Sequence, residues 1–90
     1  MSVIVVGLNH RTVPVELLER MAVPDDRAVK ALHDLQSREH LLEVAVLSTC
    51  NRTEIYAYCS RFHPAVGDVM EFLAEYSGAH PDEFNDHLYT

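Results

Sequence analysis

Residues 44–59, VAVLSTCNRTEIYAYC, decide the fold that this sequence predicts. Residues 44–47 are an apolar run, the five residues 48–52 are mainly polar, and residues 53–59 then alternate between polar and apolar side chains. Alternation with a period of two is typical of a strand that buries one face. We therefore expect two strands joined by a tight hairpin whose tip carries residues 49–52. The tyrosines at 56 and 58 should face away from the apolar side chains between them.

The segments before the hairpin predict one strand and two helices. Residues 3–8 are almost entirely β-branched or otherwise apolar, which favours a central strand with neighbours on both sides. Residues 14–21 predict a short helix. A second helix should begin at Pro24, because proline and two acids suit a first helical turn, and it should bury Ala28, Leu32 and Leu35.

The segments after the hairpin complete the predicted architecture. Pro64 should open a helix that Gly78 ends, with Val66, Met70, Leu73 and Ser77 on its buried side. Residues 87–90 should then form a short last strand. The resulting order, β-α-β-β-α-β, is the ferredoxin-like split arrangement: an α+β fold with a four-stranded antiparallel sheet in the order 4-1-3-2 and helices on one face.

Composition indicates a single domain over residues 1–90. A chain of this length with 48% hydrophobic residues can build one modest core. No segment is long and apolar enough to span a bilayer and no signal peptide is recognised, so a cytoplasmic protein is expected. Seven basic residues oppose fourteen acidic ones, for a net charge of −7, so most of the surface should repel a nucleic-acid backbone. A local basic patch would have to come from Arg11, Arg20 and Arg52.

The hairpin tip carries the residues most suited to chemistry. The thiol of Cys50 reacts as a thiolate, which the guanidinium of Arg52 can stabilise, and both side chains lie on one face wherever the backbone is extended. The same guanidinium fork matches a carboxylate, while Thr49 and Asn51 can bind an amine, a carbonyl or an ester oxygen. This combination indicates acyl chemistry on an acidic substrate. The alternative is that these residues have only structural roles: Cys50 as a small half-buried hydrophobic residue, Asn51 as a turn former and Arg52 as a solvated charge.

Cys59 and the six histidines differ from Cys50 in their expected roles. In one extended strand Cys50 and Cys59 would be about 30 Å apart, too far for a disulfide, so Cys59 is expected in the core. None of the six histidines has a helical i, i+4 partner or a zinc-type spacing, so no metal is expected. His10 is a further candidate for the site, because the loop after the first strand can approach the hairpin tip; an ordinary polar loop residue is the alternative.

Residues 7–20, GLNHRTVPVELLER, followed by residues 47–54, LSTCNRTE, resemble the amino-terminal catalytic domain of glutamyl-tRNA reductases. The resemblance spans the whole chain. It implies that Cys50 attacks the ester between glutamate and its tRNA to give a thioester. NADPH then reduces this thioester to glutamate-1-semialdehyde, which begins tetrapyrrole (porphyrin) synthesis by the five-carbon route. It also implies that Thr49, Asn51 and Arg52 contact the substrate, with Arg52 on the glutamate carboxylate.

The resemblance also implies partners that this chain does not supply. Its glycines, Gly7, Gly67 and Gly78, are too dispersed for a dinucleotide fingerprint, so NADPH should be bound by another domain and this chain alone should not complete the reduction. Glutamyl-tRNA is the implied substrate. A homodimer through a separate domain and glutamate-1-semialdehyde aminomutase are implied partners. The alternative is a non-catalytic ferredoxin-like binding or regulatory module, which would tolerate Cys50→Ser.

Overall fold

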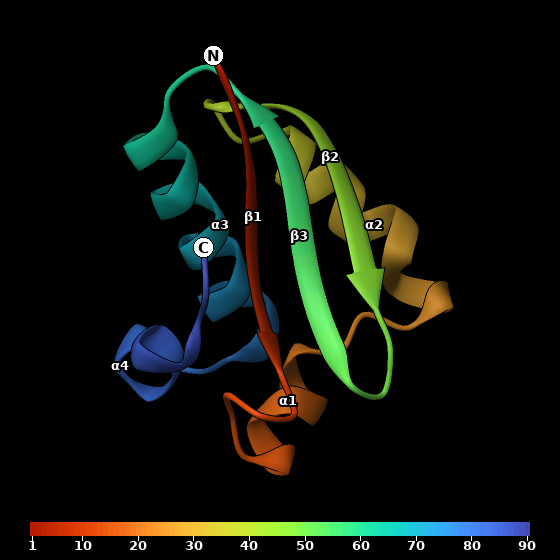
Figure 1. Cartoon of the computed structure of the whole chain (residues 1–90). Helices are drawn as coiled ribbons and strands as arrows, with labels where there is room; N and C mark the ends of the chain where they lie inside the picture. The colour runs from red at the N-terminus through yellow and green to blue at the C-terminus, as the bar shows by residue number, and fades with distance from the viewer.

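A three-stranded antiparallel sheet forms one layer of the structure and helices form the other (Figure 1). The computed structural model describes residues 1–90. The strands are β1 (Ser2–Asn9), β2 (Leu41–Ser48) and β3 (Arg52–Cys59), in the order β1-β3-β2. Both outer strands pair antiparallel with β3. The predicted α+β class, the antiparallel sheet and the hairpin are therefore confirmed.

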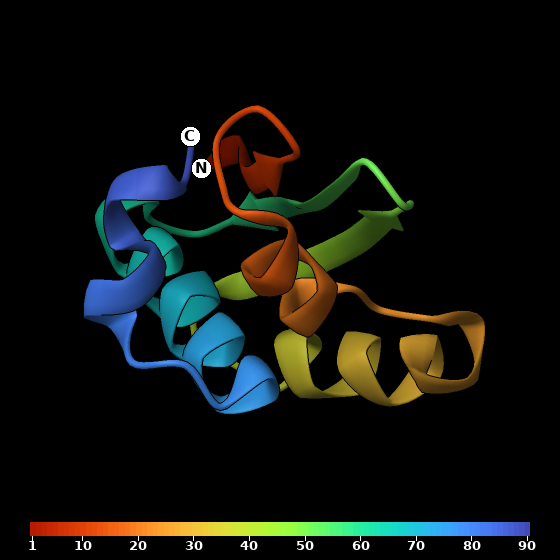
Figure 2. The same ribbon diagram turned by 90° about the horizontal axis from the view of Figure 1, so that it is seen from below.

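The helices cover one face of this sheet and leave the other face open, as Figure 2 shows from below. Their bounds are α1 (Val15–Met21), α2 (Asp25–Gln36), α3 (Phe62–Ser77) and α4 (Pro81–Phe84), followed by the 3₁₀ helix η1 (Asn85–His87). The helices predicted from residue 14 and from residue 24 are confirmed. No helix of the chain combines the length and apolar character that crossing a bilayer requires.

The core lies between the sheet and the three longer helices. Alternate residues of β1 and β3 point into it, so Val6 and Ile55 are each only 1% exposed, whereas Val3 on the open face is 76% exposed. Tyr56 and Tyr58 lie on the open face, as predicted. The fully buried core residues from the sheet and the longer helices are Ile4, Val6, Leu8, Leu17, Leu18, Met21, Ala31, Leu35, Leu41, Ile55, Ala57, Cys59, Ala65, Val69, Phe72 and Leu73.

The buried stripes of the helices are rotated from the predicted ones. In α2 the fully buried residues are Ala31 and Leu35, while Ala28 and Leu32 are half-buried. In α3 they are Ala65, Val69, Phe72 and Leu73, so only Leu73 of the expected set is fully buried. Phe72, which is only 1% exposed, lies on the side of α3 that faces α2, where it lines the hollow between the two helices beside Ala31. Gly78 ends α3 with φ of 72°, as predicted.

The position of β1 and the number of strands differ from the prediction. β3 is the central strand, and β1 lies at the edge. In place of a fourth strand, the last residues contribute one antiparallel bridge: the Gly7 N–H donates to the Tyr89 carbonyl at 3.0 Å, and the Tyr89 N–H donates to the Gly7 carbonyl at 2.9 Å. The four-stranded sheet and the complete ferredoxin-like arrangement are therefore not found.

The start of α4 explains why the last strand is so short. Pro81 follows His80, whose side chain accepts from the Asp82 N–H at 3.1 Å, while Glu83 accepts from the His80 N–H at 2.7 Å. This capping box begins a helix, and Phe84 then anchors it in the core. Residues 81–87 are therefore helical, and the pairing with β1 is confined to the bridge at Tyr89.

Candidate functional site at the hairpin tip

The hairpin tip, residues 49–52, is held by the side chain of its first residue. The Thr49 N–H donates to the Arg52 carbonyl at 2.8 Å. The Thr49 hydroxyl oxygen accepts from the N–H groups of Asn51 and Arg52 at 3.1 and 3.3 Å. The last strand pair is Ser48 with Thr53, so four residues form the loop, and none of them has a positive φ. The threonine hydroxyl thus supplies the acceptor that fixes the turn.

The loop after β1 lies against this tip. The His10 N–H donates to the Asn51 carbonyl at 2.8 Å, which confirms the predicted approach of the two loops. Asn9 shapes the β1 loop, because its side-chain oxygen accepts from the N–H groups of Arg11 at 2.8 Å and Thr12 at 3.2 Å. The side chain of His10 is exposed, so it can reach a ligand bound at the tip.

The two cysteines occupy opposite environments. Both thiols are free, with Cys50 exposed and Cys59 buried. The Cys59 thiol donates to the Ser2 carbonyl at 3.2 Å in the core, as expected for a structural residue. The backbone bends at Cys50 and becomes extended only at Arg52. The expected placement of the Cys50 and Arg52 side chains on one face requires an extended backbone, so it does not apply at Cys50.

The buried carboxylate of Glu54 lies next to Arg52 on the open face of the sheet. Glu54 is only 7% exposed although no helix covers this face. Its Oε1 accepts from the Tyr56 hydroxyl at 2.8 Å, and its Oε2 accepts from the Tyr89 hydroxyl at 2.5 Å. Arg52 Nη1 lies 3.9 Å from Oε2. Gly7 is directly opposite Glu54 in the sheet, and a side chain there would meet the glutamate.

These contacts fix the charge of the cluster. The hydrogen bonds from Tyr89 and Tyr56 hold the pKa of Glu54 below its ordinary value, with Arg52 helping and burial opposing. The bond to Glu54 raises the pKa of Tyr56, and burial together with the same carboxylate raises the pKa of Tyr89. At neutral pH the cluster therefore holds one carboxylate and two neutral phenol donors.

Sequence reasoning missed this cluster. The i, i+2 spacing of Arg52, Glu54 and Tyr56 in a predicted strand was a usable signal, since such residues share a face. The contacts of Glu54 with Tyr89 and Gly7 could not be predicted in this way, because they join segments far apart in the chain. The proposed basic patch is also reduced, because Arg20 pairs with Glu83 of α4 at 3.5 Å.

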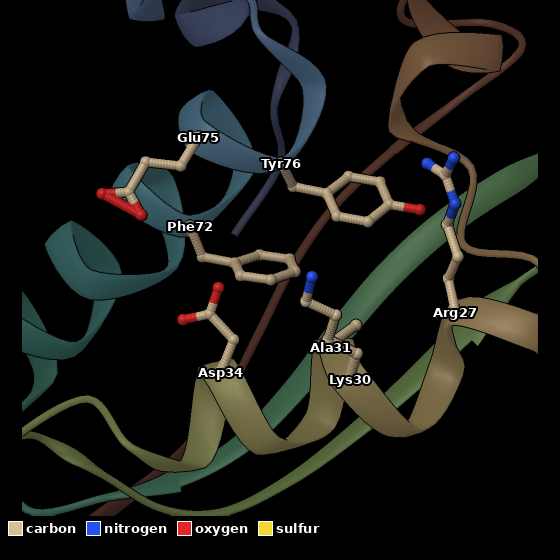
Figure 3. Close-up of a pocket in the computed structure, with 7 residues that line it drawn as sticks. All are labelled: Arg27, Lys30, Ala31, Asp34, Phe72, Glu75 and Tyr76. Carbon is tan, nitrogen blue, oxygen red and sulfur yellow. The ribbon is translucent and has the colours of Figure 1, made fainter.

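A hollow of about 480 Å³ lies between α2 and α3 (Figure 3). Seven residues line it: Arg27, Lys30, Ala31, Asp34, Phe72, Glu75 and Tyr76. No tip residue is among them. Its carboxylates are already engaged, because Arg38 contacts Asp34 at 3.0 Å and Glu75 at 2.7 Å. It contains no cysteine or histidine, so it adds no residue to the thiol-bearing candidate site at the tip.

The structure also tests the fit of a dinucleotide and of a metal. Dinucleotide binding needs clustered glycines in a turn from a strand to a helix. Here Gly7 lies within β1, Gly67 lies within α3, and Gly78 caps the end of α3. The residues of this chain therefore do not fit the phosphates of NADPH. No three histidine, cysteine or acidic side chains gather in a way that would hold a metal ion.

Fold and tip together define an α+β domain that exposes a free thiol at Cys50, two residues before Arg52 in the chain. The sequence matches the family described as "Glutamyl-tRNAGlu reductase, N-terminal domain" over residues 6–90. It is 51% identical over 90 residues to a glutamyl-tRNA reductase of Frankia alni, covering 100% of this chain and 19% of that protein. The corresponding protein of Prochlorococcus marinus is 44% identical over 89 residues, covering 99% of this chain and 20% of the relative.

A third relative, the glutamyl-tRNA reductase of Corynebacterium diphtheriae, is 45% identical over 90 residues and is covered to 20% of its length. The chain thus spans about a fifth of the curated relatives it matches. It belongs to the glutamyl-tRNA reductase family, as the N-terminal domain.

Proposed function

We propose that this chain supplies the nucleophile and the glutamate-recognising part of a glutamyl-tRNA reductase, with Cys50 as the catalytic residue. One observation carries the proposal: in a member of this family, Cys50 is an exposed free thiol on a turn that is fixed without it. No hydrogen bond of the structure uses its side chain or backbone, so the thiol is free to react.

The proposed reaction is an acyl transfer to sulfur. The Cys50 thiolate attacks the carbonyl carbon of the ester that joins glutamate to its tRNA, a carbon–sulfur bond forms, and the carbon–oxygen bond to the ribose breaks. The ribose oxygen leaves and takes up a proton. The product is a glutamyl thioester on Cys50. If water attacks it, glutamate and the free thiol are released.

The neighbouring side chains have donors available for this substrate. Arg52 is 45% exposed and uses one nitrogen in its contact with Glu54, so it can offer paired donors to the glutamate side-chain carboxylate. The Thr49 hydroxyl accepts two N–H groups and still has its proton to donate. The side chains of Asn51 and His10 are exposed at the same tip and complete the proposed contacts.

The later steps are proposed for the whole enzyme. NADPH supplies the reducing equivalents that convert the thioester to glutamate-1-semialdehyde, but the residues of this chain do not fit that cofactor. Reduction is therefore assigned to residues outside residues 1–90. Dimerisation through another part of the enzyme, transfer of the aldehyde to an aminomutase and a cytoplasmic location belong to the same proposal.

The experiment measures ester loss and aldehyde formation from glutamyl-tRNA, with and without NADPH, for the wild type and Cys50→Ser. We expect slow ester loss that depends on Cys50 and does not change with NADPH. A matched substrate control is glutaminyl-tRNA, which carries an amide in place of the side-chain carboxylate. Glutaminyl-tRNA should be deacylated more slowly than glutamyl-tRNA if Arg52 binds the side-chain carboxylate of the substrate.

Two results would contradict the proposal. Equal ester loss by wild type and Cys50→Ser removes Cys50 from the mechanism and favours the non-catalytic binding module. Aldehyde made by the 90-residue chain alone refutes the assignment of the reduction to residues elsewhere. Trapping glutamate on the wild-type chain by acid quench and mass spectrometry would support the thioester directly.

A further inference from the structure

Glu54 is placed where an acid is hard to explain by folding alone. It lies on the open face of β3, two residues after Arg52, yet it is almost fully buried. Burying a carboxylate is costly unless hydrogen bonds satisfy it. Tyr56 and Tyr89 provide those bonds, one to each oxygen. An apolar residue in this position would need none of these partners.

Three separate parts of the chain build the pocket for this carboxylate. Tyr56 comes from the same strand, and Tyr89 comes from the C-terminal segment, held by two backbone hydrogen bonds to Gly7. Gly7 provides the space, because a Cβ at this position would lie 2.8 Å from Glu54 Cγ. The glutamate is therefore held rigidly on both oxygens and along its side chain.

The one charged group that this anion faces is Arg52, at 3.9 Å from Nη1 to Oε2. It is the only ion pair that Arg52 makes, and it leaves the rest of the guanidinium fork free. A half-exposed arginine without an anchor has considerable rotamer freedom to lose when it binds a ligand. An anchor behind the guanidinium removes part of that freedom before the ligand arrives.

We propose that Glu54, clamped by Tyr56 and Tyr89, is a positioning residue that holds the Arg52 guanidinium in the orientation in which it binds the substrate carboxylate. This deepens the proposed function and rests on its assignment of Arg52 to that carboxylate. The cluster thereby links selectivity for a glutamyl over a glutaminyl ester to the docking of the C-terminal segment.

The first test measures the mobility of Arg52 directly, by ¹⁵N relaxation of its Nε–H group, with the signal assigned from Arg52→Lys. The wild type should show a restricted guanidinium, Glu54→Gln a mobile one, and Tyr89→Phe an intermediate one. Glu43→Gln, an acid-to-amide change at an exposed site in β2, should match the wild type. Equal mobility of Arg52 in the wild type and Glu54→Gln overturns the proposal.

The second test measures selectivity by titration in the Cys50→Ser background, where no acylation occurs. The probes are the α-methyl esters of glutamate and glutamine. We expect Glu54→Gln to reduce the preference for the glutamate ester by three- to tenfold and to have no such effect when Arg52 is already lysine. An unchanged preference, or an equal loss in the Arg52→Lys background, overturns the positioning role.

The two proposals fail in different ways. If Cys50 does not react with glutamyl-tRNA, the proposed catalysis fails, but the Arg52 relaxation result is unaffected. If Arg52 is equally mobile with and without the Glu54 charge, the positioning role fails even when Cys50 is acylated. A loss of fold in Glu54→Gln would appear as collapsed chemical-shift dispersion, and Tyr89→Phe, which removes one hydroxyl, then decides the outcome.

Discussion

Replacing Gly7 by alanine should destabilise the chain, although glycine in a strand is ordinarily a weakness. The added Cβ would lie 2.8 Å from Glu54 Cγ, 3.0 Å from the Thr53 carbonyl oxygen and 3.1 Å from Tyr89 Cζ. Real Cβ atoms essentially never approach a heavy atom below 3.0 Å. The Thr53 contact is to the backbone of the central strand, which cannot move aside without disturbing the ladder.

The expected size follows from two opposing effects. Overpacking of this kind typically costs about 1–3 kcal/mol. Replacing glycine by alanine recovers about 0.4–1 kcal/mol by restricting the unfolded chain. The net expectation for Gly7→Ala is a loss of about 1–2 kcal/mol. For a domain of this size that corresponds to a fall in Tm of roughly 5–15 °C.

Gly67→Ala is the matched control. Gly67 lies within α3, and a Cβ there would have no neighbour within 4 Å. Alanine is favoured over glycine inside a helix by about 0.8–1.0 kcal/mol, so this variant should be more stable than the wild type.

Urea unfolding followed by circular dichroism measures both variants against the wild type. The reasoning is refuted if Gly7→Ala has the stability of the wild type or more while Gly67→Ala is stabilised as expected. That result would show that Glu54 and Tyr89 can move away at little cost, and it would also weaken the case for a rigidly held glutamate.

Three further predictions concern the cysteines, the buried acid and a helix-to-loop contact. Iodoacetamide should label Cys50 in the folded chain and Cys59 only after denaturation, because Cys59 is fully buried; two adducts without denaturant, seen by mass spectrometry, would contradict this. Glu54→Gln should be less stable than the wild type at neutral pH, and the difference should shrink in acid. The lowered pKa of Glu54 stabilises the fold at pH values above 4.5, the ordinary pKa of a glutamate, and this contribution is lost as the pH falls through the pKa of Glu54 in the folded state. A difference in urea midpoint that stays constant with pH would argue against this. Tyr76→Phe should cost about 1 kcal/mol, because its hydroxyl donates to the Ala22 carbonyl at 2.7 Å; an unchanged urea midpoint would mean that the bond contributes nothing.

Features that depend on local patterns could be predicted from the sequence. The hairpin, the outward face of Tyr56 and the end of α3 at Gly78 each follow from a few neighbouring residues. The approach of His10 to the tip was also predicted, since it needs only the hairpin and the strand before it. These parts position the candidate site.

Features that depend on the competition between distant segments could not be predicted. The β-branched run of β1 fits an edge strand as well as a central one, because one face of the strand packs on the core in either position. The C-terminal residues have strand-like composition, but the capping box at His80 starts a helix first. The Glu54–Tyr89 bond joins residues 35 positions apart, and it depends on the packing of Phe84 and on the backbone bonds between Gly7 and Tyr89, which bring that segment to the sheet.

The hairpin turn should tolerate substitution at position 50. The turn depends on the hydroxyl of Thr49 and on backbone groups of Asn51 and Arg52, and Cys50 takes part in none of these bonds. The side chain at position 50 can therefore be exchanged without altering the scaffold that presents it. At this one position the side chain is independent of the turn, so a serine, an alanine or a selenocysteine here should change the reactivity of the tip and not its shape.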